Sequence, residues 1–279
     1  YKRQALALIG RDIVCSRIEH EAVTSWCDVE LLVNRYGLVE VKKPSQSALQ
    51  IANSETGIIQ TDVAGLWLSD MTQAFGKVPL AFNWHDCHCA MISAHKIGGP
   101  KGVGALIVKR GTELAAQIKG GGQEMGRRSG TENVLGIVGF GAAAEAAEKD
   151  LVSGEWEKIS QFRMILENMI EEFSDVPILI GRDSDRLPNT TCLVTPGWKG
   201  ETQVMQMDLE GIAVSAGSAC SSGKVRSSDV LKAIGLSEND ASCAIRISLG
   251  LDTTEEDVER FAKTWIKKYE NNLKRKNYI

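Results

Sequence analysis

The sequence predicts an α/β protein with a large domain on a mostly parallel sheet and a smaller α+β domain at the C-terminal end. Short apolar runs alternate with polar, glycine-containing segments through the first half of the chain, as buried strands of a parallel sheet do. From residue 134 onward, long helical patterns come first and strand-like runs follow. We therefore expect a large domain over residues 1–145 and a small domain over residues 146–279.

Five apolar runs in the first half have the length of buried strands, and polar residues follow four of them. The runs are residues 12–16, 48–52, 66–69, 89–92 and 103–108. The residues that follow them are Glu19 and His20, then Asn53, Ser54 and Glu55, then Asp70 and Gln73, and finally Ser93, His95 and Lys96. Ligands of open α/β sheets bind beyond the carboxyl ends of the strands, so one shared site is one interpretation. Ordinary polar loops without a common role are the alternative, and position alone does not separate the two.

The second half predicts helices at 134–150 and 156–173, and the latter has an apolar face at helical spacing. Strands are expected at 177–180, 191–194, 212–214 and 244–249. A last amphipathic helix follows Thr253 and Glu256, which fit a capping box.

Composition and charge argue against several classes of partner. A net charge of −4 gives no electrostatic basis for binding nucleic acid. No apolar run approaches the ~20 residues of a membrane helix, and the first residues do not resemble a signal peptide. Seven cysteines at irregular spacing in a long chain favour free thiols over a disulfide scaffold. We therefore expect a cytoplasmic protein that binds neither nucleic acid nor membrane.

The segment 85–89 contains two histidines and two cysteines, which suggests a metal site. Zinc ligands are usually spaced further apart, because four of them must surround one ion. We therefore expect no metal, with a metal site as the less favoured alternative.

Lys96 follows the run at 89–92 and precedes two glycines. An amine desolvated beside a strand has a lowered pKa, which is what a Schiff-base lysine requires. Most lysines lie in surface turns, so position alone favours that alternative.

Four motifs occur in a fixed order: SAHKIGGPKG at 93–102, GGGQEMGRRSGT at 120–131, SAGSACSSG at 215–223 and IRISLG at 245–250. Together they resemble cysteine desulfurases of the NifS/IscS type, in the class V aminotransferase group of pyridoxal-phosphate enzymes. The resemblance runs from about Asp12 to the C-terminus and implies the pyridoxal-phosphate transferase fold. It also implies conversion of L-cysteine to L-alanine, with sulfur transferred to an enzyme cysteine as a persulfide for iron–sulfur cluster or thio-cofactor synthesis.

The resemblance implies a pyridoxal 5'-phosphate site. Lys96 matches the catalytic lysine that binds the cofactor and removes the substrate Cα proton. Asp70 matches the aspartate paired with the pyridine nitrogen, Gln73 the amide at the ring hydroxyl, and His20 the catalytic imidazole stacked on the ring. The remaining matching cofactor contacts are Ser54, Ser93, His95 and Thr131. In the family Thr131 reaches the cofactor of a partner subunit, which implies a homodimer.

The chain departs from the family in two places. Family members carry a glycine- and threonine-containing phosphate loop upstream of the point where this chain begins, so we expect the large domain to be incomplete at its N-terminal end. Ser54 stands where the family has asparagine, and a hydroxyl can still donate or accept a hydrogen bond.

The small domain contributes two matching residues. Arg246 matches the arginine that binds the substrate carboxylate, for which its fork of donors is suited; a structural ion pair is the alternative. Cys220 matches the nucleophile that accepts sulfur, and its Ser/Ala/Gly neighbours argue against the alternative of a buried core cysteine.

The partners implied are L-cysteine, a sulfur-acceptor protein such as an iron–sulfur scaffold, and a second copy of the chain. The alternatives in the same fold are a class V aminotransferase and a selenocysteine lyase, and Cys220 weighs against a plain transaminase. A cofactor-free sulfur-relay or scaffold protein of the same fold is an alternative of a different class.

Overall fold

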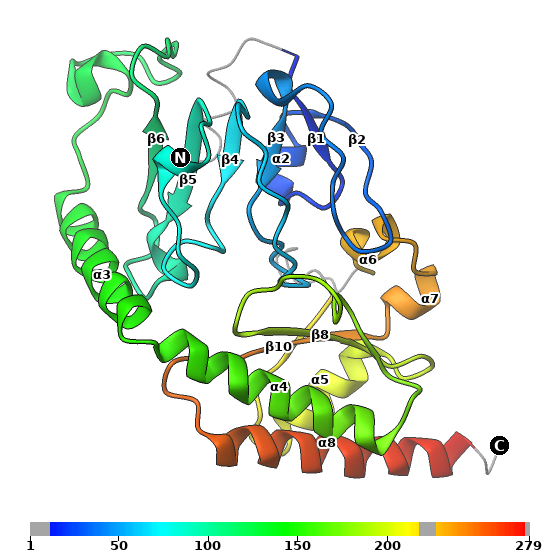
Figure 1. Cartoon of the computed structure of the whole chain (residues 1–279). Helices are drawn as coiled ribbons and strands as arrows, with labels where there is room; N and C mark the ends of the chain where they lie inside the picture. The colour runs from blue at the N-terminus through cyan, green and yellow to red at the C-terminus, as the bar shows by residue number, and fades with distance from the viewer. Residues whose placement is uncertain (1–11, 218–226, 277–279) are drawn as a thin grey trace. The chain divides into compact units, whose positions relative to one another are not determined.

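A computed structural model describes residues 12–217 and 227–276 (Figure 1). The chain divides into two compact units, and each combines segments that are distant in sequence. The first unit comprises Tyr1–Asn34, Leu38–Ser54 and Ile59–Ser153, and the second comprises Arg35–Gly37, Glu55–Ile58 and Gly154–Ile279. The assignment of domains to residues 1–145 and 146–279 stays a prediction.

The first unit is organised around a four-stranded sheet of order β3-β4-β5-β6 (Figure 1). The strands are β3 (Ala48–Gln50), β4 (Leu68–Asp70), β5 (Cys89–Ser93) and β6 (Gly104–Val108). The first three are parallel, and β6 runs antiparallel to β5. Strands β3 and β4 are buried at every position, and the apolar residues around them made these segments recognisable as buried strands in the sequence.

A second pair of parallel strands extends this arrangement. It consists of β1 (Val14–Ser16) and β2 (Asp28–Leu31), and a parallel bridge from Val14 to Ser47 joins β1 to the start of β3. The sequence analysis did not predict β2, because three of its four residues are exposed and its two apolar residues alternate with acidic ones instead of forming a continuous apolar run. The strand expected at 12–16 is found as β1.

The helical elements of the first unit are mostly short. They are α2 (Glu21–Thr24), α3 (Val134–Val152) and the 3₁₀ turns η1 (Pro44–Gln46), η2 (Phe82–Trp84), η3 (Ala94–Lys96) and η4 (Gln123–Gly126). Residues 51–67, which connect the parallel strands β3 and β4, are all described and contain no helix.

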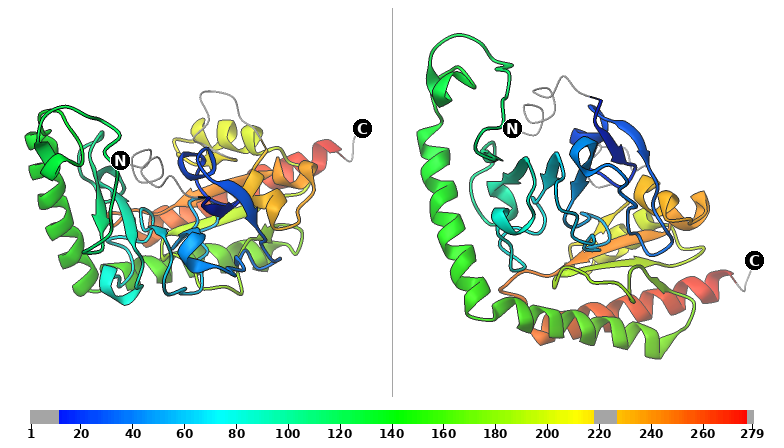
Figure 2. Two further views of the ribbon diagram at one scale, coloured as in Figure 1. Left: turned by 90° about the horizontal axis from the view of Figure 1, so that it is seen from above. Right: turned by 45° about the horizontal axis from the view of Figure 1, so that its top comes forward.

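The second unit packs two long helices and an antiparallel sheet (Figures 1 and 2). The sheet has the order β7-β8-β10-β9, and helices α4 and α8 pack against each other. The strands are β7 (Ile178–Leu179), β8 (Thr190–Val194), β9 (Ser215–Ala216) and β10 (Ala244–Ser248). The helices are α4 (Glu155–Phe173), α5 (Gly200–Asp208), α6 (Asp229–Ala233), α7 (Glu238–Ala241) and α8 (Glu255–Lys276).

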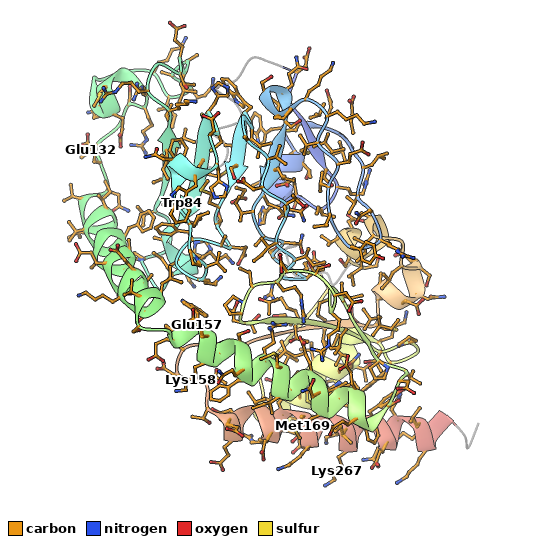
Figure 3. The ribbon with its side chains drawn as sticks, in the orientation of Figure 1. Trp84, Glu132, Glu157, Lys158, Met169 and Lys267 are labelled. Carbon is orange, nitrogen blue, oxygen red and sulfur yellow. The ribbon has the colours of Figure 1, made fainter. Side chains whose placement is uncertain are left out.

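Helix α8 shows how amphipathic spacing builds the core of this unit. Its Trp265 and Tyr269 rings lie 5.2 Å apart; Tyr269 stacks on Trp198 at 5.7 Å, and Trp265 packs against Trp198 in a tilted arrangement at 5.6 Å. Lys267 lies on the exposed side of the same helix (Figure 3). No helix in the described part of the chain is long and apolar enough to cross a membrane.

Two local predictions for the second unit were wrong. The strand expected at 212–214 begins three residues later, as β9, where Ser215 and Ala216 pair with β10. The capping box of α8 uses Thr254 and Asp257, whose side chains bond each other's backbone N–H at 3.2 and 3.0 Å. Thr253 instead accepts a hydrogen bond from the backbone N–H of Gly250, which closes the preceding turn.

Candidate active site

Three parallel strands of the first unit end in polar residues at one edge of the sheet. The strand register places Asp70, the last residue of β4, beside Gln50 of β3 and Met91 of β5. Ser93 is the last residue of β5, and Lys96 follows within the next turn. Because β3, β4 and β5 run in the same direction, the structure brings Asp70, Ser93 and Lys96 to one end of the sheet.

The Asp70 side chain is buried, at 6% exposure, and is oriented by the turn that follows it. Its Oδ1 accepts a hydrogen bond of 2.9 Å from the backbone N–H of Thr72. Gln73 lies in the same turn, and its Oε1 accepts from Nζ of Lys77 at 3.4 Å. Burial and the hydrogen bond from Thr72 therefore hold the Asp70 carboxylate in a fixed direction at the end of β4.

Lys96 closes the short turn η3 after β5 and is half-buried, whereas His95 is exposed. The chain then reverses so that β6 can pair antiparallel with β5. Gly98 has φ +81°, in the left-handed region that favours glycine. A Cβ at Gly104 would lie 2.5 Å from the carbonyl oxygen of Ile92, so only glycine allows β6 this close. These glycines fix the position of Lys96 relative to β5.

His20 caps the N-terminus of α2, just beyond the carboxyl end of β1. Its Nδ1 accepts a 3.0 Å hydrogen bond from the backbone N–H of Ala22. A nitrogen that accepts carries no proton, so the neutral ring holds its proton on Nε2. The cap therefore fixes both the orientation and the tautomer of this imidazole.

A buried polar network connects the residues before His20 to the end of β3. Glu19 Oε1 accepts from the backbone N–H of Gln50 at 2.7 Å. The side-chain amides of Gln50 and Asn53 both donate to the Ile18 carbonyl, at 2.8 and 3.0 Å. Since Gln50 also pairs with Asp70, this network places the His20 segment at the same sheet edge. The sequence analysis assigned Gln50 no role. A glutamine inside an otherwise apolar run was the feature that could have indicated a buried hydrogen-bonding residue there.

Ser54 and Thr131 occupy different surroundings. Ser54 is half-buried and follows Asn53 beyond the end of β3. Thr131 is exposed and ends the loop 120–131, which projects from the first unit before α3 (Figure 2). Inside this loop the Ser129 hydroxyl donates to the Gly121 carbonyl at 2.8 Å. Ser54 therefore follows a strand end directly in the chain, whereas Thr131 belongs to an exposed loop.

Arg246 belongs to the second unit, on the central strand β10 between Cys192 of β8 and Ser215 of β9. Its Nη2 donates to the Ser215 hydroxyl at 3.5 Å. Burial raises the pKa of the nearby Glu55 carboxyl, although a hydrogen bond from Ser228 and the charge of Arg246 act in the opposite direction. Cys220, the predicted nucleophile, lies outside the described residues.

Both histidines of the segment 85–89, the expected metal-ligand candidates, interact with residues outside the segment. His85 Nδ1 lies 2.7 Å from Asp62 Oδ1, and the His88 ring stacks near Trp67 with centroids 5.0 Å apart. It follows the exposed Trp84 at the end of η2 (Figure 3). Within residues 12–217 and 227–276, no group of three or more histidine, cysteine or acidic side chains could hold a metal ion.

Burial sets the pKa of several described thiols. It raises the pKa of Cys87 to about 11 and those of Cys89 and Cys192 to about 12. The thiolate is the nucleophilic form, so these three cysteines are poor nucleophiles at neutral pH.

The side chains at the strand ends, Asp70, Lys96 and His20, are suited to hold an aromatic cofactor that carries an aldehyde. A buried carboxylate can hold a proton on a ring nitrogen, a lysine amine can bind an aldehyde carbon, and an imidazole of fixed tautomer can pack against the ring. This donor set fits pyridoxal phosphate, and the fold with its parallel strands is that of the pyridoxal-phosphate transferases.

The aminotransferase class-V family model matches residues 3–261, and the chain belongs to this family. It is 37% identical to a cysteine desulfurase of Sinorhizobium fredii over 89% of this chain and 71% of the relative. It is also 37% identical to cysteine desulfurase IscS of Dictyoglomus turgidum, over 91% of this chain and 71% of the relative. The solved structure of a NifS-like protein from Rickettsia africae superposes with a TM-score of 0.85 at 30% identity, covering 96% of this chain and 80% of that one. The family resemblance and the fold class predicted from sequence are confirmed.

Proposed function

We propose that this protein is a pyridoxal-phosphate-dependent cysteine desulfurase that converts L-cysteine to L-alanine and transfers the sulfur to Cys220. The observation that carries the proposal is the placement of Lys96 and Asp70 at adjoining parallel strand ends. The names of its relatives, cysteine desulfurases of the IscS and NifS types, support the same activity.

When bound, the cofactor would supply an electron sink for removal of the substrate Cα proton. Asp70, oriented by Thr72, would hold a proton on the ring nitrogen. Lys96 would hold the cofactor at its aldehyde carbon and take the Cα proton of the substrate, and His20 would pack against the ring face. Because Gln73 Oε1 accepts from Lys77, the amide NH₂ of Gln73 is the group that would donate to the ring hydroxyl oxygen.

The phosphate group needs several donors, since it carries a double negative charge. Ser93 and His95 flank Lys96 at the end of β5, and Ser54 follows β3. We assign these three side chains to the phosphate and to adjoining cofactor atoms. Thr131 would reach a phosphate from the partner subunit, which its exposed position outside the strand-end cluster supports.

An exposed apolar surface on α3 supports a homodimer. Val134, Leu135 and Val138 are 61, 87 and 66% exposed, and the first of them is three residues after Thr131. Positions three and four apart lie on the same side of a helix, so these side chains form one patch. An apolar patch of this kind marks an interaction site, and a second copy that also receives Thr131 is its proposed occupant.

Arg246 is proposed to bind the carboxylate of L-cysteine through two parallel hydrogen bonds. The Cys220 thiolate then attacks the substrate sulfur, which leaves alanine and a persulfide on Cys220. We propose that the persulfide passes to an acceptor protein such as an iron–sulfur scaffold, and that this happens in the cytoplasm.

The test is the absorption spectrum of the purified protein with Lys96→Ala beside wild type. Wild type should show the visible band of lysine-bound cofactor, and Lys96→Ala should lack both the band and turnover. Lys101→Ala, an exposed lysine of the same loop, is the matched control and should retain both. Borohydride reduction should fix the cofactor on the peptide that contains Lys96. Cofactor fixed on another lysine would refute the assignment, and a wild-type protein that binds no cofactor would favour the scaffold alternative.

A further inference from the structure

Lys77 is a buried lysine in the turn that follows β4. It is only 9% exposed, and its ammonium group donates two hydrogen bonds to a single residue, Gln73. One bond goes to the Gln73 backbone carbonyl at 3.0 Å and the other to the side-chain Oε1 at 3.4 Å. Burying an ammonium group costs free energy unless its N–H groups are bonded, so the bonds to Gln73 help to keep Lys77 inside the fold.

The backbone of this turn holds the Lys77 amine close to Gln73. The backbone N–H of Lys77 donates to the Ala74 carbonyl at 3.0 Å, which closes the turn. Gly76, directly before Lys77, has φ +75°, in the left-handed region that favours glycine. A Cβ at Gly76 would lie 2.9 Å from the Cβ of Ala147, so the turn is also packed tightly from outside. The position of Lys77 relative to Gln73 is therefore set by the backbone as well as by the side-chain bonds.

The ammonium group of Lys77 decides which way the Gln73 amide faces. The two ends of a glutamine amide have nearly the same shape, but one accepts hydrogen bonds and the other donates them. An ammonium group has three donors and no acceptor, so the Gln73 atom that faces Lys77 must be the oxygen. The NH₂ group of Gln73 then points to the opposite side of the amide. A neutral residue at position 77 would not impose this orientation.

We propose that Lys77 is a positioning residue, which fixes the Gln73 amide so that its NH₂ group donates to the ring hydroxyl oxygen of the cofactor. The proposal rests on the proposed function, where Gln73 is assigned to that oxygen. In the lysine-bound cofactor this oxygen shares one proton with the nitrogen of Lys96. A hydrogen-bond donor at the oxygen favours its negatively charged form. Lys77 therefore acts through Gln73 to lower the pH at which the shared proton is lost.

The test is a double-mutant cycle on the cofactor-loaded protein, read from the pH midpoint of the visible absorption band. Lys77→Met keeps an unbranched buried side chain without the charge, and it should raise the midpoint by about one pH unit, the size expected when a hydrogen bond to a charged group is lost. Gln73→Ala should raise the midpoint by a similar amount. In the Gln73→Ala background, Lys77→Met should add nothing, because Lys77 acts through Gln73. An unchanged midpoint in Lys77→Met, or a further rise in the double variant, would overturn the proposal.

Three controls separate orientation of the amide from loss of charge. Lys77→Arg keeps a cation that can only donate, so its midpoint should stay near that of wild type. Lys77→Gln is a second neutral variant, for use if Lys77→Met does not fold, and it should raise the midpoint. Lys109→Met removes a 48% exposed lysine of the same unit, which lies 2.5 Å from Asp86, and should leave the midpoint unchanged. A rise in Lys109→Met as large as in Lys77→Met would overturn the proposal. The other charged groups assigned to the cofactor are the same in every variant, so their effects cancel in the cycle; they are Asp70, Lys96, His20 and His95.

A measurement that does not use the cofactor keeps the two proposals distinguishable. In protein labelled with ¹⁵N-glutamine, the NMR signal of the Gln73 side-chain NH₂ group is identified by its absence from Gln73→Ala. Lys77→Met should move this signal, because the amide oxygen loses its bond to the ammonium group, and should leave the signal of the buried Gln203 in place. A Gln73 signal that does not move would refute the hold of Lys77 on the amide. A protein that binds no cofactor would refute the proposed function, while the NMR signal would still report whether Lys77 orients Gln73.

Discussion

Glu167 of α4 provides a sharp test of how the second unit is stabilised. Its carboxylate is fully buried and accepts hydrogen bonds of 2.8 and 2.9 Å from Arg186 and 2.9 Å from Arg182. The Thr191 hydroxyl donates at 2.7 Å, and Arg163 lies 3.4 Å away. One carboxylate therefore contacts three guanidinium groups, and the Arg186 side chain is only 2% exposed.

We predict that Glu167→Gln destabilises the protein strongly. Glutamine has nearly the same shape, but it leaves the buried charge of Arg186 without its partner. Removing one member of a buried pair costs about 3–5 kcal/mol. The matched control is Glu171→Gln, which removes a carboxylate from the same Arg182 at the surface, where both side chains are 34 and 43% exposed. A surface pair contributes about 0–1 kcal/mol, so the control should be nearly neutral.

The assay is equilibrium unfolding in urea, followed by tryptophan fluorescence, because Trp198 and Trp265 lie buried in the same unit. The urea concentration at the midpoint of unfolding should fall markedly for Glu167→Gln and only slightly for Glu171→Gln. Equal midpoint losses in the two variants would refute the reasoning, since Glu167 is buried with several charged partners and Glu171 is a partly exposed partner of Arg182.

The pH dependence gives an independent check. Burial raises the pKa of Glu167, but the hydrogen bonds and charges of Arg186, Thr191 and Arg163 outweigh it and leave the pKa below its ordinary value of 4.5. A lowered folded-state pKa stabilises the protein above the unfolded pKa, and this stabilisation is lost as the pH falls through the folded pKa. The difference between wild type and Glu167→Gln should therefore be constant near neutral pH and shrink below about pH 4.5. A difference that grew on acidification would contradict the sign of the shift.

Three further predictions concern the proposed function and the dimer. Cys220→Ser should bind the cofactor and give the spectral change on adding cysteine, yet release no sulfide; alanine formed at the wild-type rate would show that Cys220 is not the acceptor. Thr131→Ala should weaken cofactor affinity by about 1.5–3 kcal/mol, the range for a hydrogen bond to a charged group. Mixed dimers with Lys96→Ala should restore near-normal affinity to half the sites, and sites that stay weak would mean that Thr131 acts within its own chain. Leu135→Glu should dissociate the dimer in sedimentation experiments, whereas Val152→Glu, which is 83% exposed at the other end of α3, should not; a dimer unaffected by Leu135→Glu would exclude this patch as the interface.

The sequence predicted the structure best where burial of a strand produces both the local apolar pattern and the arrangement of the sheet. Strands β3, β4 and β5 are buried, so they appear as apolar runs, and parallel strands place the residues that follow them at one edge. The order of apolar runs and polar residues along the chain therefore gave one shared site for Asp70 and Lys96 as one interpretation, and the family resemblance of the motifs favoured it. The same reasoning failed for β2, because an exposed strand such as Asp28–Leu31 has no apolar run to detect. It also misplaced the capping box, since Thr253 and Thr254 are both plausible caps and only the turn at Gly250 distinguishes them.

By itself, the sequence determined the family, the fold class and the residues proposed for the cofactor site, because these depend on ordered motifs and on periodicity within single elements. Tertiary structure alone decided which buried polar groups meet, for example Glu19 with Gln50 and Glu167 with Arg186. Each of these pairs joins elements that are separate in the chain, and no local sequence pattern indicates which residue will be the hydrogen-bond partner of a buried polar group. The physical reason is that burying a polar group without a hydrogen bond costs free energy. The partner must therefore come from whichever segment the tertiary fold brings next to that group.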